Sequence, residues 1–301
     1  MHMPGSMTRR RFLQAAAAAP VCAAFGADAF APPLAVFDKV FQEVKLTLEQ
    51  SAETVAAAGL DGVDCGVRPG GAVLPERVAE DLPRYDGLLR KRGARVLLLT
   101  TAITGVATPN AEAVLRAARQ LGVTHYRIGY WTHKPGASAE ALRGEIRAQL
   151  KELAALNREL GVCALFQNHS SSKDAKTRYA GGDLAEMREI MQDLPPEQIG
   201  VAFDLGHALL THGEQWPAHF EALQPWIKVA YIKDAKPGAG FVPFGQGELG
   251  RTDLFRRLRK MRYAAPLSVH IEYPWTPKTQ PALVKTLSET RGVVAQWIKD
   301  A

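Results

Sequence analysis

Short apolar runs and amphipathic stretches alternate eight times between Leu34 and the end of the chain, and no other feature restricts the fold as strongly. Apolar runs of this length, bounded by turn residues, are typical of buried strands. Strands that alternate with helices predict parallel βαβ units, and eight units within about 270 residues predict a single (β/α)8 TIM barrel with a parallel, eight-stranded sheet. The predicted strands are Leu34–Phe37, Gly62–Val67, Arg95–Thr100, His125–Tyr130, Val162–Asn168, Gly200–Leu205, Val229–Lys233 and Leu267–Tyr273.

The predicted helices lie between these runs, and glycines such as Gly122 and Gly161 follow them as stop signals. An open, doubly wound sheet is the alternative fold. It is less favoured because no Gly-x-Gly-x-x-Gly follows the first strand. No linker divides the chain, so we predict one barrel domain over residues 32–301. The helices are predicted at Leu48–Ala58, Asn110–Leu121, Ala139–Leu160, Asp183–Met191, Trp216–Leu223, Leu254–Met261 and Pro281–Ile298.

Residues 1–31 have the pattern of an export leader. Arg9, Arg10 and Arg11 precede an alanine-rich apolar run that is too short to span a bilayer. The order and spacing resemble a twin-arginine signal peptide. We therefore predict the twin-arginine export machinery as a partner and a periplasmic or extracellular location. An amphipathic N-terminal helix is the alternative interpretation.

Composition excludes several classes of protein. Hydrophobic residues make up 47% of the chain and charged residues 23%, which excludes a disordered tail and a disulfide-rich mini-protein. The formal net charge of +6 is mild and forms no basic stripe after the leader, so no nucleic-acid partner is expected. Strand alternation directs the sulfurs of Cys65 and Cys163 to different layers, so we predict two buried thiols rather than a disulfide.

Polar residues gather at the predicted C-terminal ends of the strands, which is where TIM barrels carry their active sites. A single polar strand end has an ordinary explanation as a turn or helix cap, and Asp234 is one such case. A whole rim of polar residues is harder to explain in this way. The set comprises Asp64, Arg127, Gln167, Asn168, His169, Asp204, His207, Tyr231, Lys233, Asp234, His270 and Glu272.

These segments, taken in order, resemble the xylose isomerase-like barrel superfamily of sugar phosphate isomerases and epimerases. The sequence FQNH (166–169) is similar to the Glu-Asn-His motif of that family, FDLGH (203–207) to its Asp-x-x-His motif, and YIKDA (231–235) to its His-x-Lys-Asp segment. LDGVDCGVR (60–68), FVPFGQGELG (241–250) and LSVHIEY (267–273) are similar to its second strand, a later loop and its final strand. The resemblance covers nearly all of the chain after the leader. It implies metal-assisted proton transfer on a sugar, keto-sugar or polyol.

The resemblance also implies one divalent metal held by Glu, Asp, His and Glu, whose positions here are Gln167, Asp204, Tyr231 and Glu272. Only Asp204 and Glu272 match. An amide cannot accept a proton at neutral pH, and a neutral phenol is a poor metal ligand. We therefore predict that Mn²⁺ or Mg²⁺ binding is weak or absent, with Gln167, Asp204 and Glu272 as the remaining metal residues. The two carboxylates could instead form salt bridges with Arg127 or Lys233.

We predict Glu272 as the catalytic base, Lys233 as the partner of a developing oxyanion and His207 as a substrate-facing residue. The predicted substrate-binding residues are Asp64, Arg127, Asn168, His169 and Tyr231. Three functions remain open. The first is an exported isomerase or epimerase of a small carbohydrate, and the second is a barrel that has lost catalysis and only binds carbohydrate. The third is a metal-dependent phosphodiesterase similar to the endonuclease branch, whose larger set of metal-binding residues is not found in this sequence.

Overall fold

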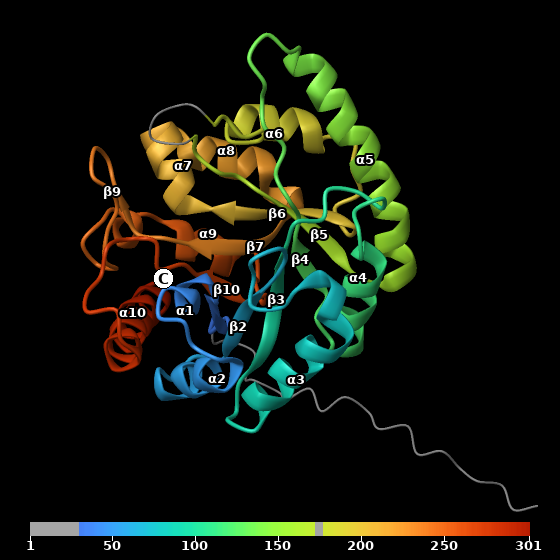
Figure 1. The fold of residues 1–301 in the computed structure, drawn as a ribbon. Helices are drawn as coiled ribbons and strands as arrows, with labels where there is room; N and C mark the ends of the chain where they lie inside the picture. Colours follow the sequence, from blue (N-terminus) through green and yellow to red (C-terminus); the bar gives the residue numbers. More distant parts are fainter. Residues whose placement is uncertain (1–29, 172–176) are drawn as a thin grey trace, which may run out of the picture.

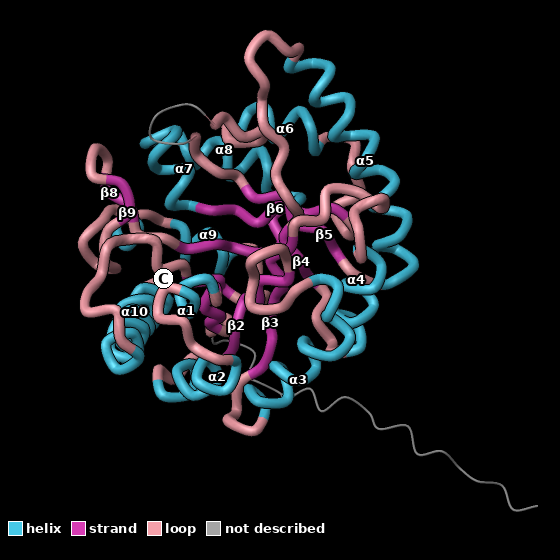
Figure 2. The backbone as a smooth tube through the Cα atoms, viewed as in Figure 1, coloured by secondary structure: helices cyan, strands magenta, loops and turns pink. Residues whose placement is uncertain are grey.

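The chain closes into a parallel barrel of eight strands, which confirms the predicted (β/α)8 fold. The computed structural model describes residues 30–171 and 177–301. Around the barrel the strands follow the order β1-β10-β7-β6-β5-β4-β3-β2 (Figures 1 and 2). Their bounds are β1 Leu34–Phe37, β2 Gly62–Val67, β3 Arg95–Thr101, β4 His125–Arg127, β5 Cys163–Gln167, β6 Ile199–Asp204, β7 Ile227–Ile232 and β10 Leu267–Val269.

Helices surround the barrel and connect its strands. Neighbouring helices contact one another along the ring, and the last helix packs against α2 beside the start of the barrel (Figure 1). Local signals fix several helix ends. Thr47 and Gln50 form a capping box at the start of α2, and Gly161 ends α5 in the left-handed conformation. The helices of this ring are α2 Leu48–Ala57, α3 Val78–Arg90, α4 Ala111–Gln120, α5 Ala139–Leu160, α6 Leu184–Met191, α8 Trp216–Leu223, α9 Leu254–Lys260 and α10 Gln280–Lys299.

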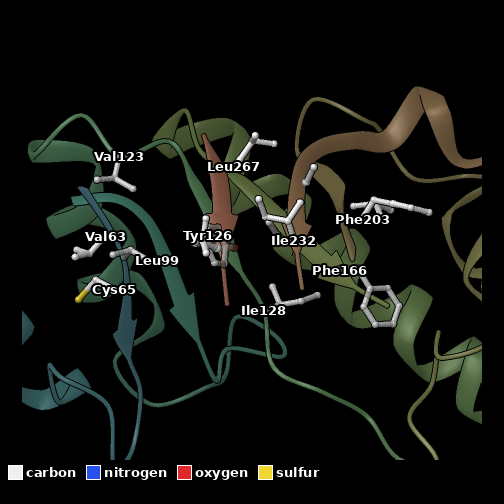
Figure 3. Packing of buried hydrophobic residues seen from close by; sticks show 14 of the residues in the cluster. Val63, Cys65, Leu99, Val123, Tyr126, Ile128, Phe166, Phe203, Ile232 and Leu267 are labelled. Atoms are coloured by element: carbon white, nitrogen blue, oxygen red, sulfur yellow. The ribbon is translucent and has the colours of Figure 1, made fainter. Parts of the chain in front are cut away.

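The main hydrophobic core lies between the outer faces of the strands and the helices. Figure 3 shows part of this layer, including Val63, Cys65 and Phe166. A second, smaller cluster fills the barrel interior and consists of Leu98, Cys163, Leu165, Ala202, Val229 and Tyr231. Cys65 belongs to the outer layer and Cys163 to the interior, and both are buried free thiols, as strand alternation predicted.

Five predicted strands were too long at their C-terminal ends, and two of them, β5 and β7, end one residue before the predicted Asn168 and Lys233. The structure ends β4 at Arg127, β6 at Asp204 and β10 at Val269. The predicted ends were Tyr130, Leu205 and Tyr273. At β6 the reason is local: the Asp204 carboxylate accepts the backbone N–H of His207 at 3.2 Å and begins helix α7 there. The polar rim residues therefore leave the sheet instead of extending it.

Several elements were not predicted. Helix α3 contains Pro83 and Gly87, both unfavourable inside a helix, so its sequence gives a weak helical signal. Burial of Leu82 and Leu89 against the barrel stabilises it nonetheless. The remaining additions are short: α1 Lys39–Gln42, α7 Leu205–His212 and an antiparallel pair of strands, β8 Ala235–Lys236 and β9 Gly240–Phe241.

None of the helices in the described part of the chain is long and apolar enough to cross a membrane. The predicted leader falls almost entirely on residues 1–29, which lie outside the described residues, so the leader remains a prediction.

Candidate active site

Four polar side chains from four neighbouring strands meet at the C-terminal end of the barrel. Gln167 ends β5, Asp204 ends β6, Lys233 follows β7 directly, and Glu272 lies just beyond β10. Strand alternation points the first three inward, above the apolar cluster that fills the barrel. The fold therefore brings together residues that are far apart in the sequence.

The Lys233 ammonium is the centre of this group. Its Nζ lies 3.0 Å from Asp204 Oδ2, 3.2 Å from Glu272 Oε2 and 2.8 Å from His207 Nε2. An ammonium has three N–H donors, so these three acceptors saturate it. The side chain of Lys233 is 2% exposed and that of Asp204 is 0% exposed, whereas Glu272 retains 21%. Glu272 is therefore the partner that solvent or a substrate reaches first.

His207 is a neutral imidazole that lies between Lys233 and Ser170. Burial, together with the charge of Lys233, lowers the pKa of His207 well below its usual value. Because an ammonium can only donate, His207 Nε2 accepts from Lys233, and the other ring nitrogen, Nδ1, faces Ser170, whose backbone N–H lies 3.2 Å away. Nδ1 also lies 2.8 Å from Ser170 Oγ. The His207 ring also packs against His169, with 3.9 Å between the ring centroids.

Charge attraction outweighs burial in this cluster. Burial alone would raise the pKa of both Asp204 and Glu272, but Lys233 reverses this effect, and the pKa of each carboxyl lies below its usual value. Burial would likewise lower the pKa of Lys233, yet the two carboxylates raise it. At neutral pH the cluster thus contains the Lys233 ammonium and two carboxylates, joined by the salt bridges that were the alternative for Asp204 and Glu272.

Gln167 holds Asp204 through its amide nitrogen. Gln167 Nε2 donates to Asp204 Oδ2 at 2.8 Å, while its Oε1 accepts the Tyr130 hydroxyl at 2.6 Å. A glutamate at this position would place another carboxylate against Asp204, whereas the amide supplies a donor. The replacement therefore matches the hydrogen bonds that surround it.

The residues at the four expected ligand positions do not fit a divalent metal. Asp204 Oδ2 already accepts from the Lys233 ammonium and the Gln167 amide. Tyr231 is 0% exposed, and burial raises its pKa well above the usual value, so its phenol stays neutral. Within residues 30–171 and 177–301, no three His, Cys, Asp or Glu side chains gather in a way that could hold a metal ion.

Asp64 begins a buried chain of hydrogen bonds that leads towards Glu272. It accepts from Thr100 Oγ1 and Ser268 Oγ, each at 2.8 Å. Because the Ser268 proton points to Asp64, His270 Nε2, 3.0 Å from the Ser268 oxygen, is the donor there. His270 Nδ1 is then unprotonated, lies 3.9 Å from Glu272 Oε1 and has no hydrogen-bond partner in the described structure. Asp64 itself is fully buried.

The other predicted binding residues form one wall of the site. Arg127 is 3% exposed, donates to the carbonyl of the next residue at 2.7 Å, and lies 4.5 Å from the Tyr130 ring centroid. Asn168 is bonded in both directions to the backbone of Asp204, at 2.8 and 2.9 Å, and so ties β5 to β6. His169 lies edge-on to Tyr130 at 5.3 Å. The roles of these residues towards a substrate stay predictions.

Asp234, which ends the YIKDA segment with Ala235, is a turn residue. Its Oδ2 accepts the backbone N–H groups of Gly245 and Gly247 at 2.8 and 2.9 Å. Its Oδ1 accepts those of Ala235 and Leu249 at 3.0 and 3.1 Å. A Cβ at Gly247 would lie 2.2 Å from Asp234 Oδ1, so this close approach requires glycine. One carboxylate thus folds the loop that follows Lys233.

Two contributors to the site were not predicted. Lys39 Nζ lies 3.7 Å from Glu272 Oε1 and supplies a second cation at the rim. It follows the end of β1 by two residues, so the strand-end rule that singled out Lys233 would have found it. Ser170, the neighbour of His207, has no comparable signal, because a lone serine in a loop is common.

Asp38, next to Lys39, is expected to make folding stability depend on pH. Burial raises its pKa to about 7, although a hydrogen bond from the Gly66 N–H opposes this effect. Between about pH 4 and pH 7 the folded protein retains a proton that the unfolded chain releases, so this group's contribution should fall by roughly 4 kcal/mol as the pH rises through that window. Denaturant unfolding of the wild type and Asp38→Asn across this range gives the unfolding free energy at each pH. The contribution of Asp38 is the difference between the two proteins in how steeply that free energy changes with pH. Equal slopes would contradict it.

Comparisons with known proteins agree with the barrel. A family model described as xylose isomerase-like TIM barrel matches residues 52–291. A xylose isomerase domain protein from Alicyclobacillus acidocaldarius superposes with a TM-score of 0.70 at 15% identity, over 89% of this chain and 100% of that chain. A 3-keto-D-glucoside 4-epimerase from E. coli superposes with a TM-score of 0.65 at 14% identity, over 87% of this chain and 100% of that chain. A D-psicose 3-epimerase from Clostridium cellulolyticum H10, solved with D-tagatose, gives 0.62 at 12% identity, over 87% and 96%. No curated protein matches the chain.

Proposed function

The chain belongs to the xylose isomerase-like TIM barrel family, and from that premise we propose that it isomerises or epimerises a sugar, keto-sugar or related polyol. The proposed chemistry moves a proton at the carbon beside a carbonyl group. The observation that carries the proposal is the Lys233–Glu272 pair, in which a buried ammonium contacts a carboxylate that is 21% exposed at the barrel mouth. Two structural neighbours that are sugar epimerases add support.

All three N–H donors of Lys233 already have acceptors, and this determines how a substrate can bind. A substrate oxygen can bind the ammonium only by replacing one of its three acceptors. Asp204 and His207 are buried, so Glu272 is the acceptor that gives way. Loosening this contact weakens the strongest of the charges that hold the pKa of Glu272 down, and the carboxylate becomes a stronger base. Substrate binding thereby prepares the base.

In the proposed step, Glu272 takes the proton from the carbon beside the substrate carbonyl. The electron pair of the broken C–H bond forms a C=C bond, and the carbonyl π electrons move to the oxygen. Lys233 stabilises that oxyanion with its positive charge and a hydrogen bond. To form an isomer, Glu272 returns the proton to the former carbonyl carbon, while the hydroxyl on the neighbouring carbon passes its proton to the oxyanion and its O–H electron pair completes the new carbonyl. To form an epimer, a water molecule delivers a proton to the opposite face of the original carbon, and Glu272 releases its own proton to solvent.

The wall beside Gln167 has groups that recognise a polyhydroxylated molecule. Arg127 forms no salt bridge among the described residues, so its remaining N–H groups can donate to hydroxyl or carbonyl oxygens. Tyr130 and His169 contribute aromatic rings, against which the C–H face of a sugar can pack. These contacts are proposed for substrate binding and leave the choice of sugar open.

Exchange of substrate protons with D₂O tests the proposal across many sugars at once. The protein is incubated with aldoses, ketoses and 3-keto-glucosides, and the proton beside the carbonyl is followed by NMR. We expect at least one sugar to lose this signal faster than in a protein-free control. Sugars that bind, as measured by calorimetry, but never exchange would instead support the carbohydrate-binding alternative.

We further propose that the protein acts outside the cytoplasm after export by the twin-arginine route. The support is the sequence around Arg9 and Arg10. Fractionation of the native host should then recover the protein in the periplasm or the medium.

A further inference from the structure

We propose that the Lys233 ammonium takes the place of the family's divalent metal, so that the site works with a built-in cation and excludes metal ions. The role of Lys233 in catalysis rests on the proposed function, whereas the exclusion of metal ions does not. The inference concerns the two positions at which the expected ligands are kept, Asp204 and Glu272, and the two at which they are replaced, Gln167 and Tyr231.

The ammonium lies where a shared cation must lie. A metal bound to both retained carboxylates would have to sit between Asp204 Oδ2 and Glu272 Oε2. Lys233 Nζ is there already, at 3.0 and 3.2 Å from these two oxygens. At these separations each contact is a charge-assisted hydrogen bond. A metal could enter only by displacing a lysine that is 2% exposed.

The replaced positions are consistent with an ammonium at this place. A glutamate at position 167 would place a third carboxylate against Asp204, whereas Gln167 adds no charge and donates to Asp204 Oδ2 at 2.8 Å. Tyr231 brings no charge and no ligand nitrogen. It packs on His270, with 4.6 Å between ring centroids, in the apolar cluster beneath the site.

The charges also balance without a metal. The two carboxylates face two lysines, because Lys39 Nζ lies 3.7 Å from the second oxygen of Glu272. A divalent ion added to this arrangement would leave an excess of positive charge in a largely buried site, which is unfavourable. Replacing Lys233 by a neutral residue removes one positive charge and vacates the space between the carboxylates.

Manganese binding tests this proposal without any measurement of turnover. Mn²⁺ is titrated into the full chain and followed by electron paramagnetic resonance. The variants are Gln167→Glu, Gln167→Glu/Lys233→Met and the same pair with Tyr231→His. We expect no saturable binding by the wild type or Gln167→Glu, because Lys233 remains in both. Gln167→Glu/Lys233→Met should bind Mn²⁺ saturably, at least 100-fold more tightly than any residual binding by the wild type, and the triple variant more tightly still.

The double and the triple variant, both of which lack Lys233, are first checked for folding by circular dichroism. The triple variant carries a new group in a buried position, and Gln167→Glu/Lys233→Met provides the test if the triple variant does not fold. Stoichiometric Mn²⁺ binding by the wild type would overturn the proposal. So would a folded Gln167→Glu/Lys233→Met variant with no gain in affinity. A protein without isomerase or epimerase activity would count against the proposed function and leave this result unaffected.

Discussion

Glu272→Gln is expected to lower kcat/KM for the true substrate by about 10³-fold while the barrel remains folded, because the amide cannot accept the substrate proton. The amide oxygen can still accept a hydrogen bond from Lys233, so the ammonium stays partnered. The loss should appear mainly in kcat. Steady-state kinetics and the rate of deuterium exchange from D₂O measure it independently.

A matched control is available at the same end of the barrel. Glu43 is an exposed glutamate that contacts Lys278 and the Trp275 indole. Glu43→Gln makes the same chemical change without touching the Lys233 cluster, so kcat should remain within about two-fold of the wild type. If Glu272→Gln were as active as Glu43→Gln, Glu272 would not be the base. Equal losses in both variants would point to a general effect on the rim.

The barrel could be predicted from the sequence because its signals are local and repeated. Helix α5 begins after Ser138 and ends at Gly161, and both cap signals are readable in the sequence. The ends of β4 and β10 were placed wrongly because strand-like residues such as Ile128, Tyr130, Ile271 and Tyr273 continue past the last paired residues. Helix α3 escaped prediction because Pro83 and Gly87 weaken its local signal, while the barrel packing that stabilises it is not local.

The candidate site was predictable as a set of residues but not as a set of contacts. Strand alternation placed Lys233 on the pocket face, yet a long side chain could reach several partners there. Which partners the Lys233 ammonium contacts depends on the hydrogen bond from Gln167 to Asp204 and on His207 remaining neutral. Both are consequences of burial and of hydrogen-bond direction, which a linear pattern does not contain. The sequence did indicate the departure from the metal set, because Gln167 and Tyr231 are visible as replacements.

Lys233→Met is expected to lower the free energy of unfolding at neutral pH by about 3–5 kcal/mol, because it leaves a buried carboxylate without its positively charged partner. For a domain of this size, that loss corresponds to a fall in Tm of roughly 6–15 °C, measurable by calorimetry. Lys39→Met is the matched control, since Lys39 also contacts Glu272 but its side chain is 50% exposed. Removing this exposed partner should change the unfolding free energy by less than about 1 kcal/mol.

The pH dependence distinguishes lost charge pairing from lost packing. In the wild type the pKa of Asp204 is lowered, so its stabilising contribution is present above about pH 4 and is lost as the pH falls through the folded pKa. Without Lys233, burial raises that pKa, and the variant is stabilised when Asp204 is protonated. The difference between wild type and Lys233→Met should therefore shrink on acidification. Adding Asp204→Asn, which keeps a residue able to cap α7, should recover part of the neutral-pH loss. A pH-independent difference, with no recovery from Asp204→Asn, would mean that methionine simply packs poorly and that the ammonium does not hold the site together.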